Sequence, residues 1–294
     1  MNHKRRFSTW VGTILGTACA LVLAAQLQAS EHPGQLTQEF HQSYPLTANG
    51  RVALENINGA VHITAWDRNE VKVDAVKYAR SKERLEEARI EVEAGSDRIS
   101  IRTEYPNHTH TFNDDDRDNP ASVEYTLTVP RGARLDEIEL INGGLDISGV
   151  TGEVRASCIN GRLRASGLGG RVKLSTVNGH LEAGFTSLSS PVDLSSVNGG
   201  LEVTLPSDAR AEIEASTVHG GIENDFGLHV VNQRYVGHNL EGQLGGGGTR
   251  IKLSNVNGRI EVRHAGDNRA LSPATDSNRK HDDDDRDDDD DDQI

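Results

Sequence analysis

The chain has 294 residues and a formal net charge of −14 at pH 7, with 45 acidic and 31 basic residues. This acidity argues against binding to nucleic acid and against electrostatic binding to anionic lipid, because both carry dense negative charge. Aromatic residues make up only 4% of the chain, whereas glycine occurs 30 times. Such a composition fits a narrow aliphatic core with many tight turns.

The first 29 residues have the pattern of a secretory signal peptide. Lys4, Arg5 and Arg6 precede an apolar stretch over residues 10–25, and Ala29 ends a segment suited to cleavage. Cleavage would remove three basic and no acidic residues, so the charge would become −17. We therefore expect an exported protein, in the periplasm or at the cell surface, with no transmembrane helix in the mature chain.

Two cysteines bear on this expectation. The residues before Cys19 are a poor match to a lipoprotein signal, so lipid attachment there is kept only as an alternative. Cys158 is then the one cysteine of the mature chain, which excludes an internal disulfide. We expect it to be a buried, unreactive thiol.

The segment before the repeats divides into three parts. Residues 30–49 are polar and predict a flexible leader. Residues 50–130 alternate with the period of β-strands and contain one helical segment over residues 81–88, which Ser81 can cap. Packing of Leu85 and Ala88 against neighbouring strands would stabilise that short helix.

A polar loop over residues 105–120 interrupts this β-rich section. Its imidazoles and carboxylates, which could serve as metal ligands, are those of His108, His110, Asp114, Asp115 and Asp116. Their spacing matches no defined site and lacks the calcium-loop pattern. They are weak metal candidates, and a solvated loop is the simpler interpretation.

The rest of the chain is built around copies of V-x-L-S-x-V-N-G-x-L-x-V, the clearest of which begins at Val192. Successive turn pairs from Asn142 onward are separated by 18, 18, 20, 21 and 38 residues. A period of about 20 residues is the signature of a stacked array. The predicted turns are Asn58-Gly59, Asn142-Gly143, Asn160-Gly161, Asn178-Gly179, Asn198-Gly199, His219-Gly220 and Asn257-Gly258.

Two folds compete for this pattern. Asn-Gly between alternating runs is typical of β-hairpins, which would pair Leu174 with Ala183. However, the residue before each Asn is always Ile or Val, as at Val177 and Val197, and it is out of phase with the inward set. A corner at Asn-Gly would let both sets point inward. This favours an all-β fold, a parallel β-helix-like β-solenoid over residues 131–265, in which Asn and Gly supply positive φ at the corners.

The position two before each Asn holds a small, mostly polar residue, as at Cys158, Thr176 and Ser196. We expect an internal ladder of hydrogen bonds there rather than an active-site row. The glycine cluster over residues 242–248 lacks the Lys and the helix of a phosphate-binding loop, so no cofactor is expected.

Residues 266–294 lose the apolar pattern and predict a disordered tail. Residues 281–294 contain ten aspartates and one arginine, a run that repels itself. Such a polyanion can collect divalent cations loosely, or act as an interaction or solubility segment.

The repeats resemble the toast-rack, adhesin-like β-repeat family of bacterial envelope proteins. The likeness rests on the motif at Val192, on G-Q-L-G-G-G-G-T-R-I-K-L-S-N-V-N-G-R-I-E-V at residues 242–262 and on I-N-G-A-V-H-I-T-A-W-D at residues 57–67. It covers roughly residues 51–263. The resemblance implies a β-helix-like fold in exported or membrane-anchored proteins and a role in adhesion or envelope scaffolding, with no catalytic residues to transfer.

Three functions follow for testing. The first is a non-catalytic envelope module that presents outward side chains to an envelope protein or a glycan. The second is a polysaccharide-acting enzyme, which needs carboxylates clustered in one groove. The third is a cation-dependent module that uses the aspartate tail. Outward positions predicted for the first are Lys173, Asp193, Glu202, Glu212, Glu214, Lys252 and Glu261. The glutamates Glu182, Glu202 and Glu261 follow equivalent turns, and that recurrence is what a structural repeat produces.

Overall fold

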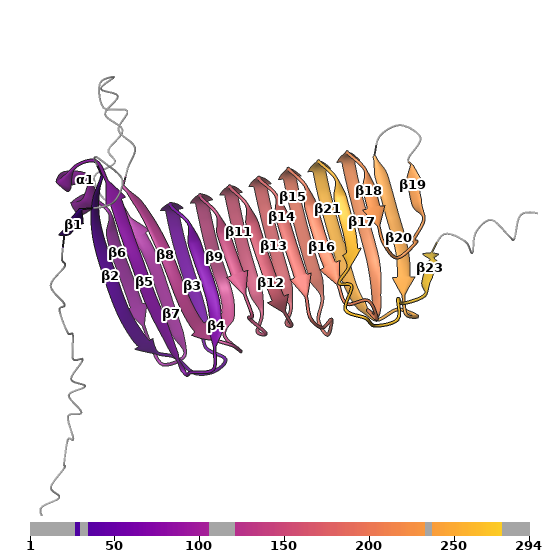
Figure 1. Ribbon diagram of the computed structural model, residues 1–294, viewed down its shortest axis with the longest axis horizontal. Helices are drawn as coiled ribbons and strands as arrows, with labels where there is room; N and C mark the ends of the chain where they lie inside the picture. Colours follow the sequence, from indigo (N-terminus) through magenta and orange to yellow (C-terminus); the bar gives the residue numbers. More distant parts are fainter. Residues whose placement is uncertain (1–26, 30–34, 106–120, 233–236, 278–294) are drawn as a thin grey trace, which may run out of the picture.

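The computed structural model describes residues 27–29, 35–105, 121–232 and 237–277. These residues form an elongated molecule in which two long sheets face each other across a narrow aliphatic core (Figure 1). Leu, Val, Ile and Ala provide most of that core, and Tyr125 is a rare large ring within it. The β-solenoid predicted from the repeats is confirmed.

Sheet A has the order β1-β2-β5-β8-β4-β10-β12-β14-β16-β22-β18 among the described strands. Their bounds are β1 Leu27–Ala29, β2 Leu36–Pro45, β4 Val61–Trp66, β5 Glu70–Ala79, β8 Ser122–Pro130, β10 Leu145–Ser148, β12 Leu163–Leu168, β14 Leu181–Phe185, β16 Leu201–Leu205, β18 Ile222–Asn224 and β22 Ile260–His264.

Sheet B has the order β19-β20-β17-β21-β15-β13-β11-β9-β3-β7-β6, and β23 also pairs with β20. Its strands are β3 Arg51–Asn58, β6 Arg89–Ala94, β7 Arg98–Glu104, β9 Arg134–Asn142, β11 Val154–Asn160, β13 Val172–Asn178, β15 Val192–Asn198, β17 Ala211–His219, β19 Val230–Asn232, β20 His238–Leu244, β21 Thr249–Asn257 and β23 Ala274–Asp276.

Each repeat forms one rung: a strand of sheet B, the Asn-Gly corner, and a strand of sheet A. Successive rungs pair in parallel, so that Val172 lies beside Val192 and Leu181 beside Leu201. Irregularities shift the register locally where β9 pairs with β3 and β11 and where β12 pairs with β14. This pairing rules out the hairpin alternative, in which Leu174 would lie beside Ala183. The predicted turn residues occupy the corners between the two sheets. The expectation that the asparagines supply positive φ there is wrong: at the described corners only glycines, such as Gly143 and Gly161, adopt it.

The rungs at both ends of the solenoid are out of sequence order. The rung β3–β4 lies between β7–β8 and β9–β10, and the rung β21–β22 lies between β15–β16 and β17–β18. The antiparallel strands β19 and β20 account for the 38-residue gap between the last two turns. After β20 the chain turns back and forms β21 between β15 and β17.

Asparagine side chains form a continuous ladder outside the corners. The Nδ2 of each asparagine donates to the Oδ1 of its neighbour, from Asn142 to Asn58 at 2.9 Å through to Asn257 to Asn198 at 2.8 Å. In the next rung His219 occupies the equivalent place. The ladder satisfies the side-chain amides and holds successive corners in the same register.

A row of small polar side chains lies inside the corners. Asn255 Nδ2 donates to Gly199 O at 2.9 Å, and Thr217 Oγ1 donates to Gly258 O at 3.1 Å. Cys158 Sγ makes the equivalent contact with Gly143 O at 3.4 Å. The buried hydroxyls of Thr176 and Ser196 have no partner among the described residues.

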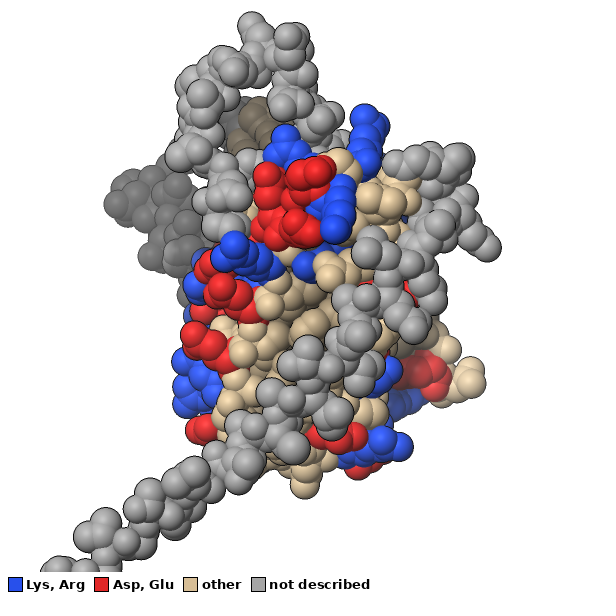
Figure 2. All heavy atoms as spheres, turned by 90° about the vertical axis from the view of Figure 1, so that its left-hand side faces the viewer, with Lys and Arg blue, Asp and Glu red and all other residues tan. Residues whose placement is uncertain are grey.

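Antiparallel strands and one helix cover the N-terminal end of the solenoid. The helix α1, Lys82–Glu87, has Ser81 as its N-cap and packs against β2 and β5, with Leu85 and Ala88 buried. Figure 2 shows this end: charged residues lie mostly around its rim, densely at the top where α1 lies, and the visible centre consists of other residues.

The flexible leader predicted over residues 30–49 is wrong for most of its length. Residues 36–45 form β2, which pairs antiparallel with all ten residues of β5. Its apolar residues are spaced by four, at Leu36, Phe40 and Tyr44, so that no period of two marks the strand. Cleavage after Ala29 would remove β1 and leave β2 as the edge of sheet A.

The disordered tail predicted from residue 266 also begins too early. Ser272 is buried, its Oγ donates to Ala209 O at 2.7 Å, and β23 pairs with β20. Hydrogen bonds to main-chain atoms hold this segment, a feature that an apolar pattern does not reveal. The aspartate run lies outside the described residues.

Two adjacent glycines allow a test of the close contact between corners. A Cβ atom on Gly143, whose φ is +143°, would lie 2.3 Å from Gly59 O, whereas a Cβ atom on Gly144 would meet nothing within 4 Å. We expect Gly143→Ala to lower the free energy of unfolding by about 2 kcal/mol or more. Gly144→Ala should change it by less than about 0.5 kcal/mol in the same urea titration. Equal effects would contradict the proposed contact.

The inner polar row offers a second matched pair. Thr176 and Thr217 are equally buried, but only the Thr217 hydroxyl has a partner. Thr217→Val should destabilise the protein by about 1 kcal/mol, and Thr176→Val should be neutral or stabilising, because it removes an unsatisfied hydroxyl. Thermal unfolding of the two variants measures the difference, and a larger loss for Thr176→Val would contradict it.

Candidate functional site

The outward face of sheet B carries three straight rows of side chains across the repeat rungs. The rows arise because the parallel pairing places equivalent residues of the repeat rungs side by side. The charged row is Arg155, Lys173, Asp193, Lys252 and Glu214; the serine row is Ser157, Ser175, Ser195, Ser254 and Ser216; the aliphatic row is Ile57, Ile141, Ile159, Val177, Val197, Val256 and Val218.

The aliphatic row corrects the sequence analysis. These residues were expected to point inward, but each exposes between 37% and 42% of its surface. The strand simply continues its alternation up to the asparagine, so the residue before it shares the face of the serine two positions earlier. The solenoid is present, but the inward direction expected for these residues, which favoured it, is wrong.

A shallow groove of about 1140 Å³ lies beside the charged row, near the beginnings of the sheet B strands. Eight of the side chains that line it are basic and four are acidic. The basic ones are Arg51, Arg98, Arg134, Arg155, Arg171, Lys173, Arg250 and Lys252, and the acidic ones are Asp136, Glu137, Glu139 and Asp193. The groove therefore has an excess of four positive charges on a chain whose net charge is −14.

Ion pairs neutralise only part of this excess. Arg134 and Arg155 contact Glu153 at 3.1 and 2.7 Å, and these contacts lower the pKa of that carboxyl against the opposing effect of its burial. By contrast, Arg171 and Lys173 are exposed and form no ion pair with a described residue. The groove can therefore attract an anionic group.

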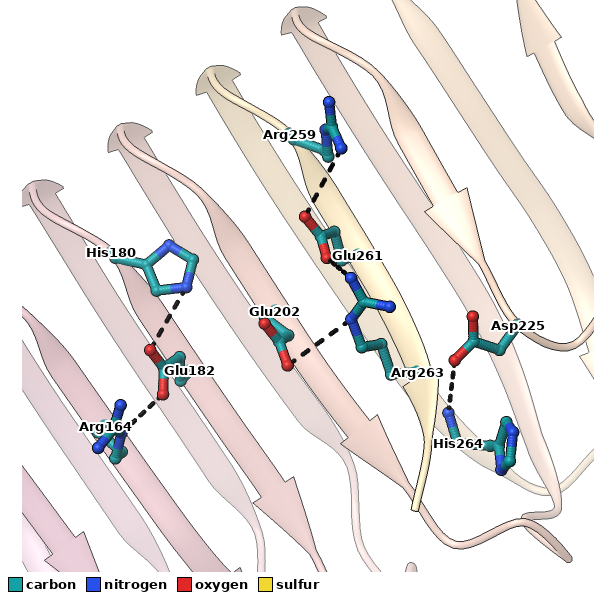
Figure 3. A network of polar contacts seen from close by, with 9 residues as sticks. All are labelled: Arg164, His180, Glu182, Glu202, Asp225, Arg259, Glu261, Arg263 and His264. Carbon is teal, nitrogen blue, oxygen red and sulfur yellow. Dashed lines mark hydrogen bonds and ion pairs between the residues drawn. The ribbon is translucent and has the colours of Figure 1, made fainter. Parts of the chain in front are cut away.

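The outward face of sheet A carries the recurrent glutamates (Figure 3). Glu182, Glu202 and Glu261 lie side by side on β14, β16 and β22. Arg164 contacts Glu182 at 2.6 Å, and Arg263 contacts both Glu202 and Glu261. His180 also approaches Glu182, at 3.6 Å.

The pairing of Glu182 with Arg164 favours the ionised form of that one carboxyl. The hydrogen bond from Arg164 lowers the pKa of Glu182, with a further contribution from the charge of that arginine, against the effect of burial. A general acid in glycoside hydrolysis needs the opposite, a carboxyl whose pKa is raised. The row resembles a solvated ion-pair ladder more than an acid–base pair.

The predicted metal candidates His108, His110, Asp114, Asp115 and Asp116 lie outside the described residues. Within the described part of the chain, no group of three or more His, Cys, Asp or Glu residues could hold a metal ion. Cys158 is buried, and burial raises the pKa of its thiol, which disfavours the reactive thiolate. None of the described helices is long and apolar enough to span a bilayer.

The fold and these faces define a two-sheet β-solenoid with a regular outward surface. The chain belongs to the Toastrack DUF4097 family, whose model matches residues 47–263. No match is found among curated proteins.

Several solved structures are similar to this chain over most of its length. A candidate cell adhesion protein from Clostridium sporogenes is 11% identical, with a TM-score of 0.44 over 77% of this chain and 99% of its own. A candidate adhesin from Bacteroides fragilis is 12% identical, with a TM-score of 0.32 over 77% and 96%. A candidate lipid-binding protein from Parabacteroides distasonis is 9% identical, with a TM-score of 0.28 over 78% and 94%. At these values the likeness says nothing about a partner.

The Arg164–Glu182 contact predicts a pH dependence. Because the folded-state pKa of Glu182 is depressed, its stabilising contribution is present above the ordinary value of 4.5 and is lost as pH falls through the folded value. Arg164→Gln should raise the pKa of Glu182 in a carboxyl-carbon NMR titration. It should also reduce the stability that is lost as the pH falls. Arg155→Gln on sheet B serves as the control, and an equal shift in that variant would contradict the assignment.

Proposed function

We propose that the protein is a non-catalytic, exported binding or scaffold module of the cell envelope that presents the outward face of sheet B to a protein or glycan partner. The aliphatic row carries this proposal. The inner side chains already complete the core of each rung, so seven half-exposed Ile and Val residues are surplus to it. Together they expose a few hundred Å², and contiguous apolar patches of that size mark interaction sites.

The geometry of the face suits an extended partner. Neighbouring strands lie about 4.8 Å apart, so the seven members of the aliphatic row span roughly 29 Å. The serine row runs beside it and offers hydroxyl donors and acceptors at the same spacing. A protein partner would cover the aliphatic row, whereas a glycan would draw more on the serines.

Export rests on the N-terminal pattern of residues 1–29, most of which lie outside the described residues. A polysaccharide-acting enzyme receives less support, because the recurrent glutamates of sheet A are paired with arginine and the pKa of Glu182 is lowered. A role for the aspartate tail in loose binding of divalent cations depends on residues outside the described part.

The test compares the two outward faces in the producing cells. A photo-crosslinking residue placed at Lys173 or Asp193 should capture a discrete envelope component. The double variant Val177→Asp, Val197→Asp should reduce that capture by about tenfold or more, because it places charge in an apolar contact. The matched control, Ser166→Asp with Thr204→Asp, adds the same charge to sheet A and should leave the capture unchanged.

The outcomes separate the alternatives. Mass spectrometry of the captured material identifies a protein or a saccharide. Equal loss of capture in the two double variants, or loss of capture in the control variant alone, would contradict the proposal. Degradation of a captured glycan that depends on Glu182 or Glu202 would favour the enzyme instead.

A further inference from the structure

The chain contains a segment whose charge is opposite to that of the groove on sheet B. Residues 281–294 hold ten aspartates and one arginine, whereas the groove has eight basic and four acidic side chains. Runs of like charge of this kind commonly act as interaction segments. The aspartate run concentrates negative charge in one short segment. The groove concentrates positive charge on a protein whose net charge is negative.

The end of the described chain lies level with this groove. The last strand, β23, pairs with β20 so that Asp276 lies beside Gly242, and β23 is at the right-hand end of the solenoid (Figure 1). Gly242 is in register with Ile213 of β17 and, one strand further, with Ile251 of β21. Ile251 in turn lies beside Val192, which lines the groove. Measured along the strands, the end of β23 is therefore level with the charged row, and the tail begins there.

The remaining chain is long enough to reach the groove. Six strand spacings separate β23 from β11, which corresponds to about 29 Å at roughly 4.8 Å per spacing. The 17 residues from 278 to 294 can extend to roughly 57 Å. The aspartates at residues 282–292 can therefore lie over Lys252, Lys173 and Arg171 without any change in the described fold.

We propose that the aspartate tail of residues 282–292 binds in the basic groove of its own chain. The contacts are carboxylates of the tail against the exposed Arg171, Lys173 and Lys252 side chains. Because these groups are exposed, the binding is electrostatic and weakens with salt. The docked tail covers the groove against other anionic groups. Divalent cations that bind the tail carboxylates compete with this docking.

This docking concerns the same face as the proposed function but depends only on the groove and the tail. It is measurable on the purified protein without any partner. A failure of the tail to dock would leave the aliphatic row and its partner untouched, and the two proposals are therefore tested separately.

Zero-length carbodiimide crosslinking of the purified mature chain tests the docking. The reagent joins a carboxylate to a lysine amine only when the two are in contact. The described residues contain five lysines, of which Lys173 and Lys252 line the groove and Lys72, Lys77 and Lys82 do not. We expect links from the tail to Lys173 and Lys252, and their loss when salt is raised to about 1 M, where the screening length is about 3 Å.

Charge variants provide the controls. Arg155→Glu with Arg171→Glu keeps both reporting lysines and should lower the yield of their links to the tail by about tenfold. Arg162→Glu with Arg259→Glu makes the same change in net charge just before two strands of sheet A and should leave the yield within about twofold. Replacing every aspartate from 282 to 292 with asparagine should abolish the links.

Mixing isotope-labelled and unlabelled chains decides which copy supplies the tail. Links within one isotopic form alone support docking in the same chain. Links mainly between the two forms, equal links to Lys72 and Lys82, or links that persist at high salt would overturn the proposal.

Discussion

The structure depends on the close approach of successive Asn-Gly corners. A Cβ atom at Gly161 would lie 1.7 Å from the carbonyl oxygen of Gly143, and the same position in the next two rungs is equally crowded. Only glycine allows the main chains to approach at this point. The asparagine ladder then fixes the corners side by side through amide hydrogen bonds. Together these contacts keep equivalent corner residues of successive rungs side by side.

The alignment of equivalent residues turns sequence repetition into rows on the surface. The serines of five rungs line up because their valine and leucine neighbours do so in the core. Any residue type that recurs in the motif becomes a stripe, and any departure becomes a local feature. The basic groove is such a local departure from the repeat. Arg171 and Lys173 line it, whereas the equivalent positions of the next rung hold Pro191 and Asp193.

The sequence predicted the solenoid and its corners because Asn-Gly pairs at a period of about 20 residues carry both turn chemistry and repetition. Other features lacked such a signal. The outward direction of Val177 and its equivalents follows from how far each strand runs before it bends, which composition does not encode. The strand β2 is stabilised by main-chain pairing with β5. The groove depends on charges brought together from distant strands, and hence on knowing the register.

The exchanged order of the end rungs affects how the protein responds to force. The chain leaves its last repeat from β22, which is flanked on both sides by β16 and β18. Once β23 has detached, a pull on the C-terminus acts along a strand held by two ladders of hydrogen bonds, so that these must break together. An array whose last repeat stood at the edge would unzip one bond at a time. The exchange of rungs thus makes the C-terminal end of this solenoid a mechanical clamp.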